Sequence, residues 1–133
     1  SDTDESESAD MSGPRGWVDA SCSYLEAVQL HDSGQADEAS EKVDHALRQF
    51  EQHSGFGVNA GLERERCLRL RAKILHEQGD PAAAEADEIE ADQIAEYAEM
   101  LHATVERRLL ADREVLRQEA AREYEAMWQA ARG

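Results

Sequence analysis

Two segments of this chain, residues 22–46 and 67–91, repeat each other at an offset of 45. Of their 25 aligned positions eight are identical, where chance gives about one or two. Self-similarity at this spacing is typical of arrays of helical hairpins, in which small side chains let two antiparallel helices approach and glycine makes the turn between them. The identical pairs are Cys22/Cys67, Leu25/Leu70, Ala27/Ala72, Leu30/Leu75, His31/His76, Gly34/Gly79, Ala39/Ala84 and Ala46/Ala91.

The hydrophobic pattern predicts helices throughout and no strand. Apolar residues recur at spacings of three and four in three segments, and glycine-containing stretches separate these segments. A fourth helix is predicted from Pro81 to Arg132, because Asp80 and Pro81 suit a helix start and no glycine or proline follows before Arg132. We expect it to be one helix of about 50 residues, or two with an unmarked bend. The first three predicted helices are 17–32, 36–53 and 61–78.

These elements predict an all-α fold of two antiparallel hairpins followed by a long C-terminal helix. Residues 1–15 carry five acids and little that is apolar, so a disordered acidic tail is expected there. The hairpins are expected over 16–95 and a capping or coiled-coil helix over 96–133. Cys22 and Cys67 are predicted to be buried thiols at equivalent core positions.

The repeated positions resemble those of the tetratricopeptide repeat. The shared pattern is Ala-x-x-Leu-x-x-x-Gly-x-x-x-x-Ala-x6-Ala, present in both copies. The resemblance covers residues 17–95 and departs from the family in its period of 45 and in its lack of the closing proline. It implies stacked helical hairpins that bind a protein partner on the concave face formed by the first helix of each repeat. The pattern positions are Ala27, Leu30, Gly34, Ala39 and Ala46, then Ala72, Leu75, Gly79, Ala84 and Ala91.

Composition excludes several classes of protein. The formal net charge of −16 has the wrong sign for binding a phosphate backbone, so no nucleic-acid partner is expected. No stretch approaches a membrane span of about 20 apolar residues, so no membrane partner is expected either. With two cysteines and no secretory signal visible, the expected location is the cytoplasm.

The third predicted helix is the exception to the acidic balance, because it carries five of the fourteen basic residues. Arg66, Arg69, Lys73 and His76 fall at offsets 0, 3, 7 and 10, which places them on one stripe of a helix. They suit a carboxylate-rich peptide, and with Tyr24 and His31 they form the predicted partner-binding set. The alternative is that these bases pair with the chain's own acids, namely Glu63, Glu65 and the acids of the fourth helix.

The C-terminal part has a different character. From Thr104 to Arg132 six arginines balance six acids, and apolar residues recur at spacings of three and four. We expect this segment to cap the hairpins or to pair with another chain, including a second copy. The residues predicted to do so are Leu109, Leu116, Tyr124, Met127 and Trp128.

No catalytic constellation and no cofactor are predicted. Glu99-x-x-His102 has the spacing of one half of a di-iron site, with Glu26, Glu41 and His45 on other helices, but such a site needs two pairs of this kind. The sequence therefore favours a non-catalytic protein–protein interaction module: an adaptor, a scaffold, a chaperone-like binder or a complex subunit that takes an acidic segment or helix. The alternatives are a structural subunit that self-assembles through its last helix and, in another class, a four-helix carboxylate metalloprotein.

Overall fold

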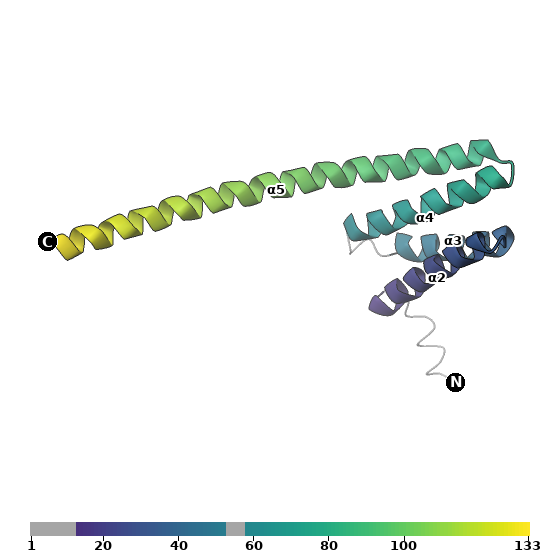
Figure 1. Cartoon of the computed structure of the whole chain (residues 1–133), viewed down its shortest axis with the longest axis horizontal. Coiled ribbons are helices and arrows are strands. Elements are labelled where there is room, and N and C mark those ends of the chain that lie inside the picture. The colour runs from purple at the N-terminus through teal and green to yellow at the C-terminus, as the bar shows by residue number, and fades with distance from the viewer. Residues whose placement is uncertain (1–12, 53–57) are drawn as a thin grey trace, which may run out of the picture. The chain divides into compact units, whose positions relative to one another are not determined.

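The computed structural model of the chain describes residues 13–52 and 58–133. In these residues the protein is all-α, and its helices pack as two antiparallel hairpins, α2 with α3 and α4 with α5 (Figure 1). The predicted fold class is therefore confirmed, including the single long helix at the C-terminus. Among the described residues, no helix combines the length and the apolar content that a membrane span requires. The helices are α2 (Pro14–Asp32), α3 (Ala36–Glu51), α4 (Val58–Glu77) and α5 (Pro81–Arg132).

Two of the predicted helix starts fall too late in the chain. Helix α2 begins at Pro14, three residues before Trp17, because proline at the first helical position needs no hydrogen-bond acceptor for its nitrogen. The end of the predicted acidic tail therefore belongs to α2, and residues 1–12 lie outside the described part. Helix α4 begins at Val58, so Gly61 is helical; a Cβ at Gly61 would lie 3.5 Å from Cγ2 of Ile94 on α5.

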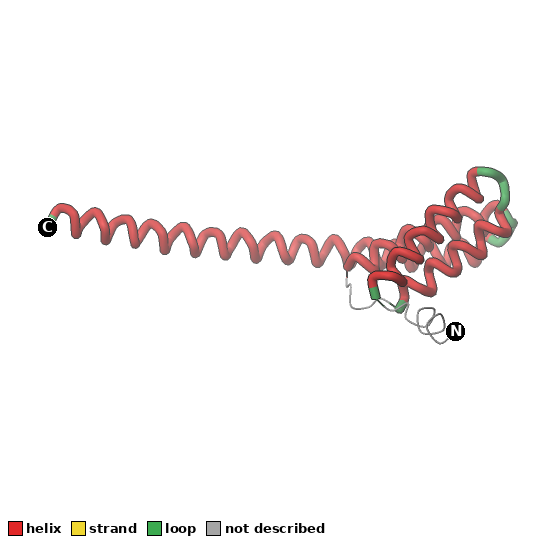
Figure 2. Tube along the Cα trace, turned by 90° about the horizontal axis from the view of Figure 1, so that it is seen from below, coloured by secondary structure: helices red, strands yellow, loops and turns green. Residues whose placement is uncertain are grey.

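The two hairpin turns are built identically and lie at the same end of the hairpins (Figure 2). Gly34 and Gly79 adopt φ of 79° and 81°, the left-handed region that glycine reaches without strain. The residue after each glycine donates its backbone amide to the carbonyl five residues earlier, Gln35 to Leu30 and Asp80 to Leu75, both at 2.9 Å. This is the Schellman arrangement at a helix end. The Asp80 side chain caps α5 by accepting from the amide of Ala83 at 3.3 Å, as predicted.

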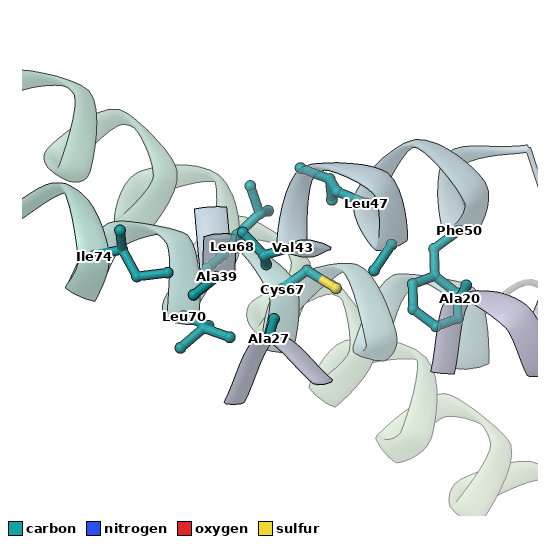
Figure 3. Packing of buried hydrophobic residues seen from close by; sticks show 12 residues of the cluster. Ala20, Ala27, Ala39, Val43, Leu47, Phe50, Cys67, Leu68, Leu70 and Ile74 are labelled. Carbon is teal, nitrogen blue, oxygen red and sulfur yellow. The ribbon is translucent and has the colours of Figure 1, made fainter. Parts of the chain in front are cut away.

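A small core lies between the helices and follows the repeat (Figure 3). The alanines conserved between the two copies are all buried, which lets the helices of each hairpin approach closely. Trp17 packs edge-on against Phe50, with 5.0 Å between ring centroids. The largest side chains that are fully buried are Phe50, Leu68, Ile74, Val43 and Cys67.

The prediction of equivalent buried cysteines is wrong for one of the two. Cys67 is buried, but Cys22 is exposed. The neighbouring leucines differ in the same way, because Leu70 is 8% exposed and Leu25 is 56% exposed. Helix α4 packs against the first hairpin with the face that carries Cys67 and Leu70. No described residue packs on the matching face of α2. Ser23, one position further along α2, is buried instead.

The chain divides into two compact units, residues 1–98 and 99–133. We refer to the described part of the first as the hairpin unit and to the second as the helix unit. Every residue of the helix unit is exposed.

Candidate protein-interaction surfaces

Two contacts between an acid and a nitrogen base connect the helices of the first hairpin. Nε2 of His45 on α3 lies 2.8 Å from a carboxylate oxygen of Asp19 on α2. Nζ of Lys42 lies 2.9 Å from Glu26, and this hydrogen bond raises the pKa of Lys42. In both pairs the acid is on α2 and the nitrogen base on α3.

The second hairpin has ion pairs at the same repeat positions, with the signs reversed. Arg64 lies 2.7 Å from Glu90, and Arg71 lies 2.7 Å from Asp87; each residue stands 45 positions after its counterpart. Here the bases are on α4 and the acids on α5. Pairing α2 with α5 through these positions would set acids against acids, so the charges disfavour that arrangement.

Arg71 joins three helices. Its Nε and Nη2 donate to the two carboxylate oxygens of Asp87 at 2.7 and 2.8 Å, and its Nη1 donates to Asp44 on α3 at 3.1 Å. The Asp87 side chain is 9% exposed, and its hydrogen bond raises the pKa of Arg71, so the guanidinium stays charged. The two bonds to Asp87 lie within the second hairpin, and the bond to Asp44 joins that hairpin to the first.

Two arginines of the predicted basic stripe are paired within the chain. Arg66 Nη1 donates to both carboxylate oxygens of Glu63 at 3.2 Å. Arg69 Nε donates to Glu65 at 2.8 Å and its Nη2 to Asp92 at 3.1 Å; the first of these bonds is the larger cause of a raised pKa for Arg69. Exposed pairs of this kind stabilise a fold only slightly, so the carboxylates of a partner can compete for the arginines.

His76 and Lys73 complete the stripe. Nε2 of His76 lies 2.6 Å from Glu88 on α5. Lys73 is exposed and has no ion-pair or hydrogen-bond partner among residues 13–52 and 58–133. The pairing that the sequence left as an alternative is thus present for three of the four bases.

The other two predicted binding residues lie apart from each other on α2. Tyr24 is half-buried, with Cζ of Arg66 4.6 Å from its ring centroid, a cation–π contact between α2 and α4. His31 is in the last turn of α2, where its Nε2 lies 2.8 Å from Glu77 of α4. Only Tyr24 therefore contacts the basic stripe.

The large apolar side chains of the helix unit all face water. The five predicted contact residues are Leu109 (64% exposed), Leu116 (65%), Tyr124 (69%), Met127 (70%) and Trp128 (50%).

The sequence contains a further signal for this surface, a period of eleven residues. Ile94, Val105, Leu116 and Met127 follow one another at this interval, and four residues after each comes another small or apolar residue: Ala98, Leu109, Ala120 and Ala131. Eleven residues make slightly more than three turns of an α-helix, so these positions form one continuous stripe along α5. We call Val105, Leu109, Leu116, Ala120, Met127 and Ala131 the α5 stripe.

The charges of the helix unit are balanced and mostly unpaired. This unit contains six arginines and seven acids, so its formal net charge is −1, whereas that of the whole chain is −16. Within residues 99–133 the one ion pair is Arg117–Glu114 at 3.4 Å, between side chains 73% and 56% exposed. The remaining charges are therefore available to another molecule.

The nucleophilic and metal-ligating side chains form no site in the described residues. Burial raises the pKa of the Cys67 thiol to about 12, which keeps it protonated and unreactive. Among residues 13–52 and 58–133 there is no cluster of three or more His, Cys, Asp or Glu side chains that could hold a metal ion.

Comparison of the chain with protein-family models, curated proteins and solved structures finds no match.

Proposed function

We propose that this chain is a non-catalytic protein–protein interaction module whose main contact element is the α5 stripe. The observation that carries the proposal is the complete exposure of a helical segment that has apolar residues along one continuous line. Burying one such Leu or Met side chain on a partner stabilises a complex by roughly 1.5–3 kcal/mol. The resemblance of the hairpins to tetratricopeptide repeats supports the same class of function.

The partner that best fits the α5 stripe is another helix, because the stripe is one side chain wide and several turns long. A second copy of this segment meets the charge requirement, since arginines and acids are nearly equal in number and most are unpaired. The hairpin unit carries the excess acidic charge and would repel its copy. Self-association through the α5 stripe is therefore expected to strengthen as salt screens that repulsion.

The test compares a residue on the stripe with a neighbour away from it. Leu116→Glu places a charge on the stripe, whereas Leu110→Glu changes a similarly exposed leucine on another side of the helix. Light scattering at micromolar concentration should give a mass above the monomer for the wild type and Leu110→Glu, and a monomer for Leu116→Glu. Two results together would contradict the proposal. The wild type would be a monomer, and no helical partner would bind it in a way that Leu116→Glu abolishes.

A second candidate function is the capture of an acidic segment by the stripe Arg66, Arg69, Lys73 and His76. Lys73, unpaired among the described residues, and the weak exposed pairs of the two arginines favour it. Lys73→Glu together with Arg69→Glu should abolish binding of a poly-glutamate peptide at low salt, with Arg108→Glu as the control. Equal binding by both variants would remove this candidate.

A further inference from the structure

The outer face of α2 is apolar and uncovered. Val18 is 60% exposed, Leu25 is 56% exposed, and the Cys22 thiol between them is also exposed. The three residues are spaced i, i+4 and i+7, so they lie on one side of the helix. This surface belongs to the hairpin unit.

The internal repeat shows what covers this face in the second hairpin. The residues of α4 that correspond to Cys22 and Leu25 are Cys67 and Leu70, which are 0% and 8% exposed. They belong to the core cluster that includes Val43 and Leu47 of α3 (Figure 3). The face that α4 presents to the first hairpin is thus the face that α2 leaves open.

The two ends of this pair of hairpins differ. Asp44 of α3 reaches Arg71 of α4, and Leu47, three residues later on the same side of α3, is 4% exposed. The residue of α5 that corresponds to Leu47 is Asp92, whose side chain is 72% exposed. At the positions that match Val43 and Leu47, α5 thus carries the acids Glu88 and Asp92, although Ile89 beside them is 52% exposed, whereas α2 keeps apolar residues on its outer face.

Charge indicates which helix would fit on α2. Arg71 uses one side of its guanidinium for Asp87 in its own hairpin and the other for Asp44 in the preceding one. Its counterpart on α2 is Glu26, which already holds Lys42, the counterpart of Asp87. A helix docked on α2 as α3 docks on α4 would place its residue equivalent to Asp44 beside Glu26, and the charge of Glu26 favours a base there.

We propose that the outer face of α2 binds a basic amphipathic helix from another protein. The helix presents two apolar residues spaced i and i+4, as Val43 and Leu47 are, and a lysine or arginine at i+1 in the place of Asp44. The apolar residues cover Val18, Cys22 and Leu25, and the base binds Glu26. The net charge of −16 attracts such a helix to the chain.

The chain supplies its own probe for this site. A peptide of residues 36–51 carrying Asp37→Lys, Glu38→Lys and Asp44→Lys has the required pattern and a net positive charge, and the same peptide with Asp44 unchanged is its matched control. Binding is read from the alkylation rate of Cys22 in the full-length protein, because a docked helix shields that thiol. At millimolar peptide the Asp44→Lys form should slow alkylation of Cys22 at least fivefold more than the control form.

Variants of the protein sharpen the test. Leu25→Asp should abolish the protection, and Glu26→Arg with Lys42→Glu, which keeps the ion pair with reversed signs, should transfer the preference to the control peptide. Equal protection by both peptides, or none, would overturn the proposal. So would protection of Cys22 that rises with protein concentration alone, which would identify a second copy as the occupant, or alkylation of Cys67, which would show that the peptide had displaced α3.

Discussion

The two hairpins have the same internal register but different surroundings. At each repeat position the residues that face the partner helix of the same hairpin match: small side chains are buried, glycines turn, and ion pairs recur with reversed sign. The identical residues that face outward from a hairpin differ in burial, because α4 has a neighbour on that side and α2 has none among the described residues. The repeated residues therefore determine how the two helices of a hairpin pack on each other. The burial of an outward-facing residue depends instead on whether a further helix packs on that side.

The cysteines give the largest expected difference between the hairpins. With a pKa of about 12, Cys67 has roughly a thousandfold less thiolate at neutral pH than an ordinary thiol, and burial slows its reaction further. We expect a maleimide to label Cys22 at least a thousandfold faster than Cys67 in the folded protein. Mass spectrometry of Cys22→Ser and Cys67→Ser variants measures each rate, and comparable rates would show that the second hairpin opens readily.

The aligned leucines should differ in their effect on stability. Leu70→Ala removes a buried side chain and is expected to lower the free energy of unfolding by about 2–4 kcal/mol, whereas Leu25→Ala should change it by less than about 0.5 kcal/mol. Urea unfolding followed by Trp17 fluorescence, in a Trp128→Phe background, compares them. Equal losses would mean that something covers α2 in solution.

The ion pairs at the second repeated position should differ in the same direction. Arg71→Ala leaves Asp87 buried without its partner, which costs about 2–3 kcal/mol. Glu26→Ala removes only an exposed contact with Lys42, so we expect no resolvable shift of the urea midpoint. If Arg71→Ala is as mild as Glu26→Ala, then Arg71 does not hold the hairpins together.

Sequence reasoning predicted the elements of the fold because local signals specify them. The glycines at 34 and 79, the cap at Asp80 and the spacing of apolar residues each act within a few residues of the chain, and the structure contains all of them. The two late helix starts were wrong by three residues each, because proline and glycine within a first helical turn look like parts of a loop.

The interaction surfaces were less predictable, for two physical reasons. Identity between Cys22 and Cys67 implied equal burial, but both residues face outward from their hairpins, so the burial of each depends on whether another helix packs on that side. The pairs of Arg66 with Glu63 and of Arg69 with Glu65 are local and were the alternative that the sequence left open. The bond of Arg69 to Asp92 spans 23 residues, and no local pattern reveals it. The eleven-residue period of the α5 stripe could have been found in the sequence, although its exposure could not.

The turn glycines should give the smallest effect, and the same one in both hairpins. A Cβ at Gly34 or Gly79 would meet no atom within 4 Å, so alanine is disfavoured only by the positive φ of 79° or 81°. An alanine in this region costs about 1 kcal/mol, and Gly34→Ala and Gly79→Ala should each lower the free energy of unfolding by that amount. Asparagine tolerates the left-handed region better, so Gly34→Asn and Gly79→Asn should each recover part of the loss. Urea unfolding in the same Trp128→Phe background checks all four variants. Unequal losses at the two glycines would show that the turns differ in solution, and would limit the shared register to the helices.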